Sequence, residues 1–419
     1  MNNIIPSSMN STLYNLIGYL LLPIMVLRLI FKGPTYQKRI GERLGFFKTI
    51  SVDVVWVHCV SVGEFRAAVV LIDALIMEYP HYKILVTSTT PTGSKAITKH
   101  YQNRVFHLYF PFDVPFIIKR YLKKINPKAC ILLETEIWPN LIHNLHKQNI
   151  PTLLANARLS QRSLEKYQKM SVFTKQTLNK LTLIATQNHN STNRFKQLGA
   201  EKVITLGNIK FDQNPSVDSE VVAQLQKITG KRKIVVFAST HKGEEAKIIE
   251  AYTRNPIDAL MVIVPRHPQR FNEVYKLAKR KGLKISKRSD NTHCEACNVL
   301  LGDSMGEMMA YFKIADVVFM GGSLNDTGGH NMLEPAALSK AIIFGPNVFN
   351  FSEISADLLS QNASIQVQNA DELLEKVAML LTDKANAKTL GNNANQYFKS
   401  RQGVVKNLIQ EIKNHIKHP

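Results

Sequence analysis

A short run after the first predicted strand, His58-Cys-Val-Ser-Val-Gly-Glu64, carries residues suited to acid–base chemistry. Ser61 and Gly63 suit a turn from a strand into a helix, and Gly63 lets a ligand approach the backbone because it has no side chain. Glu64 then falls in the first helical turn. A carboxylate there can act as a general base, or it can simply complement the positive end of the helix dipole. The spacing alone favours neither role.

A second strand-to-helix connection, Thr87-Ser-Thr-Thr-Pro-Thr-Gly93, is rich in hydroxyl groups. Thr89 and Gly93 are candidates for holding an anion or a sugar, since hydroxyls and backbone N–H groups gather there. A capped turn explains the same residues equally well. The run lacks the Gly-Lys-Ser/Thr ending of a P-loop, which excludes a nucleotide-hydrolysing P-loop.

Two carboxylates stand at the end of a buried strand in Glu134-Thr-Glu136-Ile-Trp-Pro-Asn140. Acidic pairs at such a place can bind a metal ion, but no matching Asp-X-Asp is evident on a neighbouring loop. Hydrogen bonds from Glu134 and Glu136 to sugar hydroxyls or to basic neighbours are therefore favoured, and no metal is expected.

Basic residues follow the next strands. Arg158, in Asn156-Ala-Arg-Leu-Ser, supplies a guanidinium whose geometry matches phosphate. Lys210, in Gly207-Asn-Ile-Lys-Phe-Asp, precedes a polar stretch and can enter a cleft. The alternative for both is a turn with solvated charges.

The most specific run of the chain is Gly321-Gly-Ser-Leu-Asn-Asp-Thr-Gly-Gly-His-Asn-Met-Leu-Glu-Pro335. The N–H groups of a loop that begins Gly321-Gly322-Ser323 can reach a phosphate, and the following helix adds its positive end. Asn331 and Glu334 are three residues apart and are expected on one helix face, where Glu334 can accept hydrogen bonds from a ribose diol. A tight turn without a ligand is the alternative.

Two more loops of the second half carry candidate residues. Arg266 and His267 follow a strand and can face a phosphate. Met305-Gly306-Glu307 places flexible backbone before a helix.

Parallel strands must position these residues. Apolar runs typical of strands buried on both faces alternate with helical stretches, such as 64–79 and 115–124. The predicted strands of the first half are 54–59, 84–88, 105–108, 129–133, 152–155 and 183–186. The pattern restarts in the second half with 234–238, 260–264, 299–301, 317–320 and 342–344. This alternation predicts an α/β protein with two doubly wound, Rossmann-like domains whose strand ends face a cleft, which is the GT-B architecture.

The expected domains are 1–32, 33–212 and 213–419. The first is an N-terminal membrane anchor, because residues 13–31 are almost entirely apolar, although Pro23 and Arg28 interrupt them. Spanning and interfacial anchors are both consistent with this segment. Basic residues follow it directly, which places the remaining chain on the cytoplasmic side. The final stretch, 385–418, is amphipathic and basic and is expected to pack back on the first domain or to lie near the membrane.

Charge and cysteine usage narrow the class further. Through Asp212 the chain has 27 Lys and Arg against 11 Asp and Glu, a net charge of +16, whereas the remainder has 26 against 21, a net charge of +5. A basic first half indicates an anionic partner, and no nucleic-acid motif or arginine-rich tract is present.

Four cysteines in 419 residues do not form a secreted disulfide framework. We expect Cys294 and Cys297 to be an incidental loop pair.

Together these motifs resemble the 3-deoxy-D-manno-octulosonic acid (Kdo) transferases of lipopolysaccharide synthesis. The resemblance covers nearly the whole chain and rests on several long motifs in the family's order. They are Ser-Val-Gly-Glu64, Glu-Thr-Glu-Ile-Trp-Pro-Asn140, Asn-Ala-Arg-Leu-Ser160, Gly-Asn-Ile-Lys-Phe-Asp212, Pro-Arg-His267 and Gly-Gly-His-Asn-Met-Leu-Glu-Pro335.

The resemblance implies an inverting, metal-independent transfer of Kdo from CMP-Kdo to the lipid A precursor lipid IVA, without a cofactor. Glu64 matches the family's general base. Arg266 and the glycine-rich loop would stabilise the leaving phosphate, Asn331 and Glu334 would hold the ribose, and Gly306 with its neighbours would line the cytidine. The implied location is the cytoplasmic face of the inner membrane of a Gram-negative cell.

One position departs from the family's pattern: Lys242 stands where an acidic residue is more usual. This puts the role of that position alone in doubt. A related transferase using a UDP-sugar is one alternative function, and a non-catalytic basic membrane or nucleic-acid binder is another. Nothing in these patterns indicates an oligomeric state.

Overall fold

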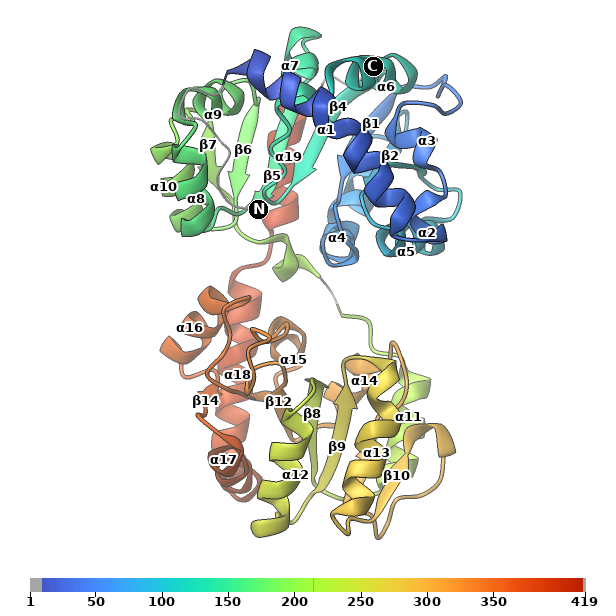
Figure 1. The fold of residues 1–419 in the computed structure, drawn as a ribbon. Helices are drawn as coiled ribbons and strands as arrows, with labels where there is room; N and C mark the ends of the chain where they lie inside the picture. The colour runs from blue at the N-terminus through green and yellow to red at the C-terminus, as the bar shows by residue number, and fades with distance from the viewer. Residues whose placement is uncertain (1–9, 214, 417–419) are drawn as a thin grey trace. The chain divides into compact units, whose positions relative to one another are not determined.

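The computed structural model describes residues 10–213 and 215–416. The chain divides into two compact units. The first unit comprises the chain up to Gln213 and again from Gly403 onward (Figure 1). The second unit comprises the residues between these two segments of the sequence. The division lies one residue from the expected domain boundary after Asp212. The C-terminal helical stretch is split at Gly403, because its last helix belongs to the first unit.

The first unit is built on a seven-stranded parallel sheet of order β3-β2-β1-β4-β5-β6-β7. Its strands are β1 (Val54–His58), β2 (Lys83–Ser88), β3 (Phe106–Tyr109), β4 (Pro127–Leu133), β5 (Thr152–Ala157), β6 (Leu183–Thr186) and β7 (Val203–Thr205). Its helices are α1 (Ser11–Phe31), α2 (Pro34–Gln37), α3 (Ile40–Arg43), α4 (Val62–Glu78), α5 (Pro91–Tyr101), α6 (Pro115–Ile125), α7 (Pro139–Lys147), α8 (Gln161–Gln168), α9 (Ser171–Leu178), α10 (His189–Gln197), the 3₁₀ turn η1 (Ile209–Asp212) and α19 (Val404–Lys413).

Alternating side chains of β1 show why both faces of this sheet are covered. Val55 and Val57 pack into a core with α4, α5 and α19, whereas Val54 and Trp56 pack into a core with α6, α7 and α10. Side chains of a strand alternate between faces, so a continuous apolar run feeds two cores at once.

The second unit repeats the plan with a parallel sheet of order β10-β11-β9-β8-β12-β13-β14. Its strands are β8 (Ile234–Thr240), β9 (Leu260–Pro265), β10 (Ile285–Lys287), β11 (Val299–Leu301), β12 (Val317–Met320), β13 (Ala341–Phe344) and β14 (Ile365–Gln366). Its helices are α11 (Ser219–Thr229), α12 (Glu244–Arg254), η2 (Pro268–Arg270), α13 (Phe271–Arg280), η3 (Arg288–Asp290), α14 (Met308–Ile314), α15 (Leu333–Ala337), α16 (Ser352–Ser360), α17 (Ala370–Thr382) and α18 (Lys384–Ser400). The prediction of an α/β chain with two doubly wound parallel sheets is confirmed.

Three strands were missed by the sequence analysis: β7, β10 and β14. Each is two or three residues long, lies at an edge of its sheet and is only partly buried. An edge strand needs no long apolar run, so the pattern that marks central strands does not mark these.

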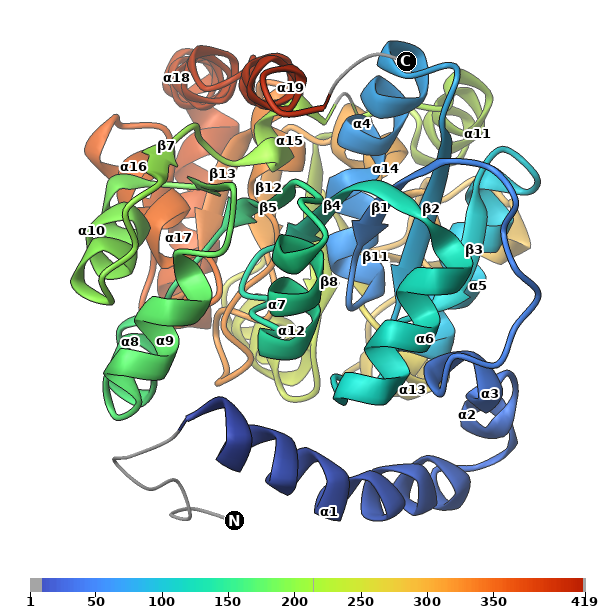
Figure 2. The ribbon, with the colours of Figure 1, turned by 90° about the horizontal axis from the view of Figure 1, so that it is seen from above.

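The predicted apolar segment at the N-terminus is confirmed as helix α1, which is long and apolar enough to cross a membrane. Its first half lies against the first unit, along α6 and α9 (Figures 1 and 2). The Tyr14 hydroxyl donates to Asp113 Oδ2 at 2.8 Å, the Tyr14 ring packs on Phe173, and the Tyr19 ring stacks on Phe116.

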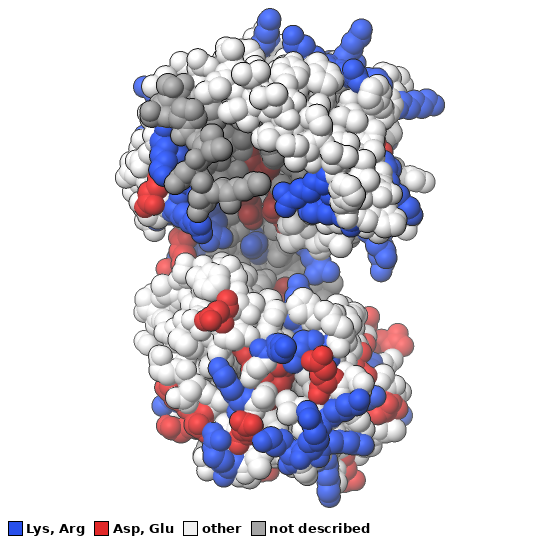
Figure 3. All heavy atoms as spheres, in the orientation of Figure 1, with Lys and Arg blue, Asp and Glu red and all other residues white. Residues whose placement is uncertain are grey.

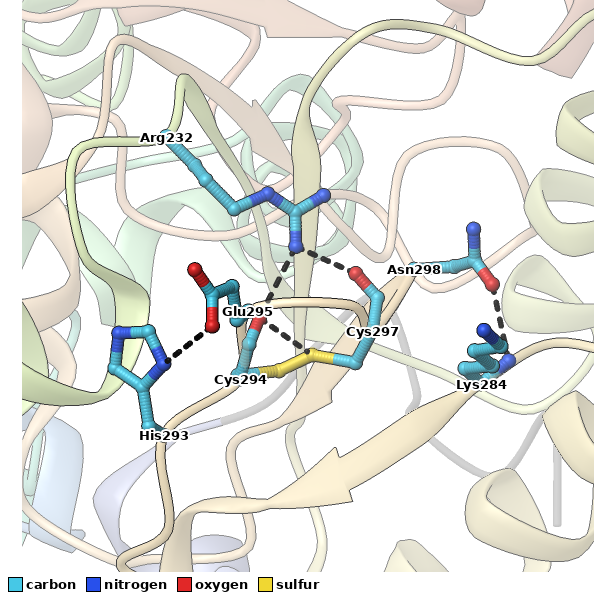
Figure 4. Close-up of a disulfide and its surroundings, with 7 residues drawn as sticks. All are labelled: Arg232, Lys284, His293, Cys294, Glu295, Cys297 and Asn298. Carbon is cyan, nitrogen blue, oxygen red and sulfur yellow. Dashed lines mark hydrogen bonds and ion pairs between the residues drawn. A yellow bond between two sulfur atoms is a disulfide. The ribbon is translucent and has the colours of Figure 1, made fainter.

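Cys294 and Cys297 are joined as a disulfide, which corrects the expectation of an incidental loop pair (Figure 4). A guanidinium nitrogen of Arg232 donates to the carbonyl oxygens of both cysteines. The sequence spacing allowed this bond but did not require it, because the loop conformation that brings the two Cα atoms to 5.3 Å is not visible in the sequence.

Candidate active site

The turn between β1 and α4 holds Glu64. Ser61 caps α4, and its Oγ accepts the N–H of Glu64 at 3.4 Å. The Glu64 carboxylate turns back to accept the N–H of Val60 at 2.7 Å. This reciprocal arrangement is a variant of the capping box, so Glu64 does stabilise the helix end. A Cβ at Gly63 would meet only Ser61 Oγ, at 3.8 Å, and the space beside the turn is therefore open.

The electrostatic setting of Glu64 also suits a base. Burial raises the pKa of Glu64 to about 7, and the negative charges of Glu134 and Glu136 add to this rise. The hydrogen bond from Val60 works against it. A carboxylate whose pKa lies near neutral pH can both accept and release a proton under physiological conditions. Helix capping and base chemistry are thus compatible roles for one side chain.

Strand β4 lies beside β1 and delivers the two other carboxylates to the same edge of the sheet. Glu134 adopts a left-handed backbone with φ 57°, which is uncommon for a residue with a side chain. Glu136 accepts a hydrogen bond from the Trp138 indole at 2.7 Å. Residues with a strained backbone, such as Glu134, concentrate at functional sites, where surrounding contacts impose the conformation.

His58 is a neighbour of this site to which the sequence analysis gave no role. Its ring is fully buried and stacks on Phe110, with 3.7 Å between centroids. Its Nε2 lies 3.7 Å from Glu136 Oε2. Burial lowers the pKa of His58, which favours a neutral ring. A histidine inside an apolar strand gives no sequence signal beyond its presence.

The ends of β5 and β7 contribute the basic candidates. Asn156 has a left-handed backbone with φ 52°, and its Oδ1 accepts the N–H of Ile209 at 3.1 Å. It thereby fixes η1, in which the half-buried Lys210 lies. Arg158 is exposed, and its carbonyl accepts the hydroxyl of Thr135. The two loops after β4 and β5 are therefore tied together.

The loop after β2 is held by its own hydroxyls. Thr90 caps α5 by accepting the N–H of Gly93 at 3.1 Å, and the Thr89 hydroxyl donates to the Val60 carbonyl at 3.0 Å. Gly93 is buried, and a Cβ there would lie 2.9 Å from Thr90 Oγ1. These contacts favour the capped turn over a sugar-binding loop for Thr89 and Gly93.

A carboxylate that the sequence analysis missed organises the glycine-rich loop of the second unit. Glu244, the first residue of α12, is fully buried. Its carboxylate accepts N–H groups of Gly322 at 2.7 Å, Ser323 at 3.0 Å and Leu324 at 2.9 Å, and that of His241 at 2.9 Å. The start of the loop therefore presents its N–H groups to Glu244, which corrects the expectation that they reach a phosphate.

Gly321 and Ser323 likewise contact other residues of the second unit. A Cβ at Gly321 would lie 2.8 Å from the carbonyl oxygens of Ala238 and Ser239, so only glycine fits where β12 leaves the sheet beside β8. Ser323 is fully buried, and its hydroxyl donates to Met320 O while accepting the N–H of Gly345. We therefore assign Ser323 to holding the loop rather than to direct donor contact.

Asn331 and Glu334 do meet. Asn331 Nδ2 donates to Glu334 Oε1 at 3.2 Å, although Asn331 precedes α15 rather than lying on it. Both side chains are half-buried. An amide and a carboxylate side by side can share the hydroxyls of a ribose.

Arg266 and His267 are exposed beyond the end of β9. The next cation, Arg270, is instead committed to the fully buried Glu245, with both carboxylate oxygens within 2.9 Å of one guanidinium nitrogen. Arg266 and His267 are thus placed to meet a ligand, whereas Arg270 and Glu245 hold the loop. Lys242 is exposed at the neighbouring turn.

Met305, Gly306 and Glu307 line a cavity of about 560 Å³ within the second unit. This volume lies in the usual range for small-ligand sites. Gly306 has φ 89° with open space around its Cα, and Met305 is 63% exposed. The Glu307 carboxylate is already paired with Arg288, at 3.2 Å. The other lining residues are Ser216, Val217, Asp218, Val221, Met309 and Ala310.

Each unit thus gathers its candidates at the carboxyl ends of its parallel strands, where open α/β sheets bind ligands. Glu64, Glu134 and Glu136 share one such edge in the first unit, and Arg266, His267 and the glycine-rich loop share another in the second. Within the described ranges, no group of three or more His, Cys, Asp or Glu side chains is arranged to hold a metal ion.

Known proteins resemble this chain along most of its length. The family model for 3-deoxy-D-manno-octulosonic-acid transferase (kdotransferase) matches residues 38–213, and that for glycosyl transferases group 1 matches residues 188–397. The 3-deoxy-D-manno-octulosonic acid transferase of Haemophilus influenzae is 38% identical over 400 residues, which cover 92% of this chain and 93% of that protein. That of Rickettsia bellii is 31% identical over 414 residues, which cover 96% and 98%.

Solved structures add support for the fold. A glycosyltransferase from Rickettsia africae superposes with a TM-score of 0.60 over 88% of this chain and 99% of that chain, at 14% identity. At this identity the likeness concerns the fold alone. With the two parallel sheets and the group 1 match, it confirms the predicted GT-B class.

Proposed function

Since the chain belongs to the 3-deoxy-D-manno-octulosonic acid transferase family, we propose that it transfers Kdo from CMP-Kdo to the lipid A precursor lipid IVA. The observation that carries the reaction is the raised pKa of Glu64 at the open turn after β1. Glu64 accepts the proton of the attacking sugar hydroxyl, whose oxygen bonds to the anomeric carbon of Kdo. The bond from that carbon to the phosphate oxygen breaks, CMP departs, and the configuration inverts.

The second unit holds the donor in this proposal. Arg266 and His267 face the phosphate, and the Asn331–Glu334 pair accepts the ribose. The cavity beside Met305 and Gly306 is large enough for the cytidine. On the acceptor side, Lys210 and Arg158 offer positive charge to the phosphates of lipid IVA.

The reaction is proposed to need no metal ion or other cofactor. The carboxylates at the end of β1 and β4 already have hydrogen-bond donors, since Glu64 accepts from Val60 and Glu136 accepts from Trp138. Stabilisation of the leaving phosphate is assigned instead to the cations of the second unit.

We place the protein at the cytoplasmic face of the inner membrane. Several large apolar side chains of α1 are exposed: Leu16, Tyr19, Leu20, Leu21, Ile24, Leu27, Ile30 and Phe31. The face along which α1 runs is broadly uncharged, with Lys and Arg side chains around it (Figures 1 and 3). A helix docked sideways through Tyr14 and Tyr19 suits an interfacial position, with the remaining apolar side chains in the bilayer.

Product analysis by mass spectrometry tests this function. The full chain in detergent receives CMP-Kdo, lipid IVA and EDTA, beside Glu64→Gln and a matched Glu165→Gln variant, whose carboxylate lies on the surface helix α8. We expect added Kdo mass, one or more units, with the wild type and Glu165→Gln. Loss of the base should lower the rate by about 10²–10⁴-fold.

Three results would each reject a part of the proposal. No product from the wild type, while UDP-N-acetylglucosamine supports transfer, would move the chain to a UDP-sugar donor. A Glu64→Gln variant as active as the wild type would remove Glu64 from the reaction. Activity lost in EDTA and restored by a divalent cation would reject metal independence alone.

A further inference from the structure

Three histidines meet at the carboxyl ends of three adjacent strands in the second unit. His241 follows β8, His267 follows β9, and His330 lies in the loop after β12. After β8 the chain forms β9, β10 and β11 on one side of it and then crosses to β12, β13 and β14 on the other. The gap between β8 and β12 is therefore the topological switch point, where ligands bind in such folds. His241 and His330 stand on either side of this gap.

The two rings on either side of the switch point are in direct contact. Nε2 of His241 lies 2.8 Å from Nε2 of His330, and the rings stack with 5.0 Å between centroids and 13° between planes. His267 meets His241 edge-on, at 5.2 Å between centroids. A hydrogen bond between two Nε2 atoms requires that one carries a proton and the other does not. The neutral pair therefore has one shared proton and different tautomers on its two rings.

Backbone contacts lie beside both histidines. The backbone N–H of His241 donates to the Glu244 carboxylate, and the Gly322 backbone lies so close to His330 that a Cβ at Gly322 would be 3.1 Å from the His330 ring. The carboxylate that organises the glycine-rich loop therefore also holds the backbone of His241.

The charges around the pair are mainly positive. Arg266, His267 and Arg270 oppose a positive charge on it, and burial acts in the same direction. The pKa of His330 is lowered to about 4 and that of His241 is also lowered. The nearby carboxylates are committed, Glu244 to loop N–H groups and Glu245 to Arg270. Lys247 adds a further cation, held by the Leu324 carbonyl at 3.0 Å.

We propose that the His241–His330 pair is a proton-accepting element of the donor site, which takes up one proton from solvent when a nucleotide phosphate binds beside it. This inference rests on the proposed function, because it places the phosphate at the ends of β8, β9 and β12. The added proton goes to the free Nδ1 of the donating ring, which becomes an imidazolium that still donates to its neutral partner. No covalent bond changes, and the proton returns to solvent when the nucleotide leaves.

The charges around the pair determine whether nucleotide binding takes up or releases protons. Without ligand the pair is neutral at pH 7.5, since the surrounding cations and burial hold its pKa low. A phosphate dianion offsets those cations and raises the pKa of the pair. Binding therefore takes up protons, and nucleotide affinity falls as pH rises through the pKa of the bound state.

Isothermal titration calorimetry of CMP into the full chain in detergent at pH 7.5 tests this proposal. Titrations in buffers of different ionisation enthalpy give the number of protons exchanged. We expect the wild type to take up a proton fraction of up to one per CMP, and His241→Gln and His330→Gln to take up close to none. A matched His293→Gln variant, changed at an exposed loop histidine, should behave as the wild type.

The sign of the proton exchange distinguishes protonation of the histidine pair from deprotonation of the ligand phosphate. A phosphate monoester that enters a cationic site loses any proton it still carries, which is release rather than uptake, and it does so in every variant. CMP binding without uptake, or equal uptake in wild type and in a folded His330→Gln variant, overturns the role of the pair. No CMP binding by the wild type overturns the proposed donor instead. Since His241→Gln and His330→Gln interrupt the same contact from different loops, misfolding of one leaves the other as the test.

Discussion

The Glu64 side chain illustrates how one residue can serve both the fold and the proposed reaction. Its carboxylate accepts the N–H of Val60 at the start of α4, yet burial and two neighbouring carboxylates keep its pKa near neutral. A glutamate chosen for capping alone would be most favourable when ionised and solvated. The environment of Glu64 therefore costs stability at high pH and supplies a usable base.

The pH dependence of the reaction should report this environment. If Glu64 is the base, as proposed, its ionised form is the active one, and kcat/KM for the lipid acceptor should rise about tenfold per pH unit below the pKa and level off above about pH 7. Initial rates measured from pH 5.5 to 8.5 with saturating CMP-Kdo and subsaturating lipid acceptor check the profile. Glu165→Gln should keep it. A profile that is already flat from pH 5.5 upward, as the ordinary glutamate value of 4.5 would give, would contradict the burial argument.

At the scale of elements, the glycine-rich loop depends on α12. The three N–H groups of Gly322, Ser323 and Leu324 converge on the Glu244 carboxylate from a loop almost 80 residues away. Burying these donors without an acceptor would be costly. The first residue of a helix thus sets the path of a distant loop.

Glu244→Gln should loosen this loop. An amide offers one acceptor oxygen instead of two, and its NH₂ group faces other donors, so we expect unfolding free energy to fall by about 2 kcal/mol or more. Affinity for CMP should fall as well. Glu250→Gln, on the same helix, breaks only a surface ion pair with Lys281 and should change stability by less than about 1 kcal/mol. Urea unfolding and CMP calorimetry of both variants provide the measurement; equal effects would reject the role of Glu244.

The central elements were predictable because their residues obey simple periodicities. All eleven predicted strands are present, since a run such as Ile234–Thr240 is buried on both faces and must be apolar throughout. The position of Glu64 in the first turn of α4 and the closeness of Asn331 to Glu334 were predictable for a similar reason, because spacing after a strand end fixes position along a helix or turn. The roles of these residues stay predictions.

Residues whose roles depend on distant partners were not predictable. Glu244 and Glu245 look like two solvated acids at a helix start, yet both are fully buried. Their partners, the Gly322–Leu324 N–H groups and Arg270, become neighbours only through the parallel order of β9, β8 and β12. Ser323 was misassigned for the same reason, because sequence alone does not reveal that a hydroxyl is enclosed.

At the scale of the whole molecule, apolar surface and positive charge occur together in the first unit. Exposed side chains of α1 lie in a unit whose chain through Asp212 carries a net charge of +16. An anionic bilayer satisfies both features, since burial in the interface and attraction to lipid headgroups act together.

Vesicle binding should therefore depend on α1. Leu20, Ile24 and Leu27 are each at least half exposed, and changing all three to Gln should weaken binding to phosphatidylglycerol-containing vesicles by about 100-fold or more. Flotation with such vesicles gives the measurement. Met77→Gln, an 82% exposed apolar position on α4, is the control and should bind normally. Undiminished binding of the triple variant would place the membrane contact elsewhere.

The C-terminal segment should matter for the first unit rather than for the second. Asp212 accepts the N–H groups of Gly403 and Val405, and Leu408 and Ile412 join the core of α4 and α5. A chain ending at Gln402 should lose protease resistance in residues 33–213 while keeping CMP binding. Limited proteolysis with mass mapping checks this outcome. A truncated chain whose first unit resists proteolysis as before would show that α19 is dispensable.

The return of the chain to its first unit has a consequence for biosynthesis. The helix that closes the first core leaves the ribosome after every residue of the second unit. Domains generally fold as they are synthesised, starting from the N-terminus, but here the N-terminal core cannot be complete until α19 has been synthesised. The second unit, which needs no later segment, can fold first. The nascent chain would thus expose α1 early and complete the core of its first unit last.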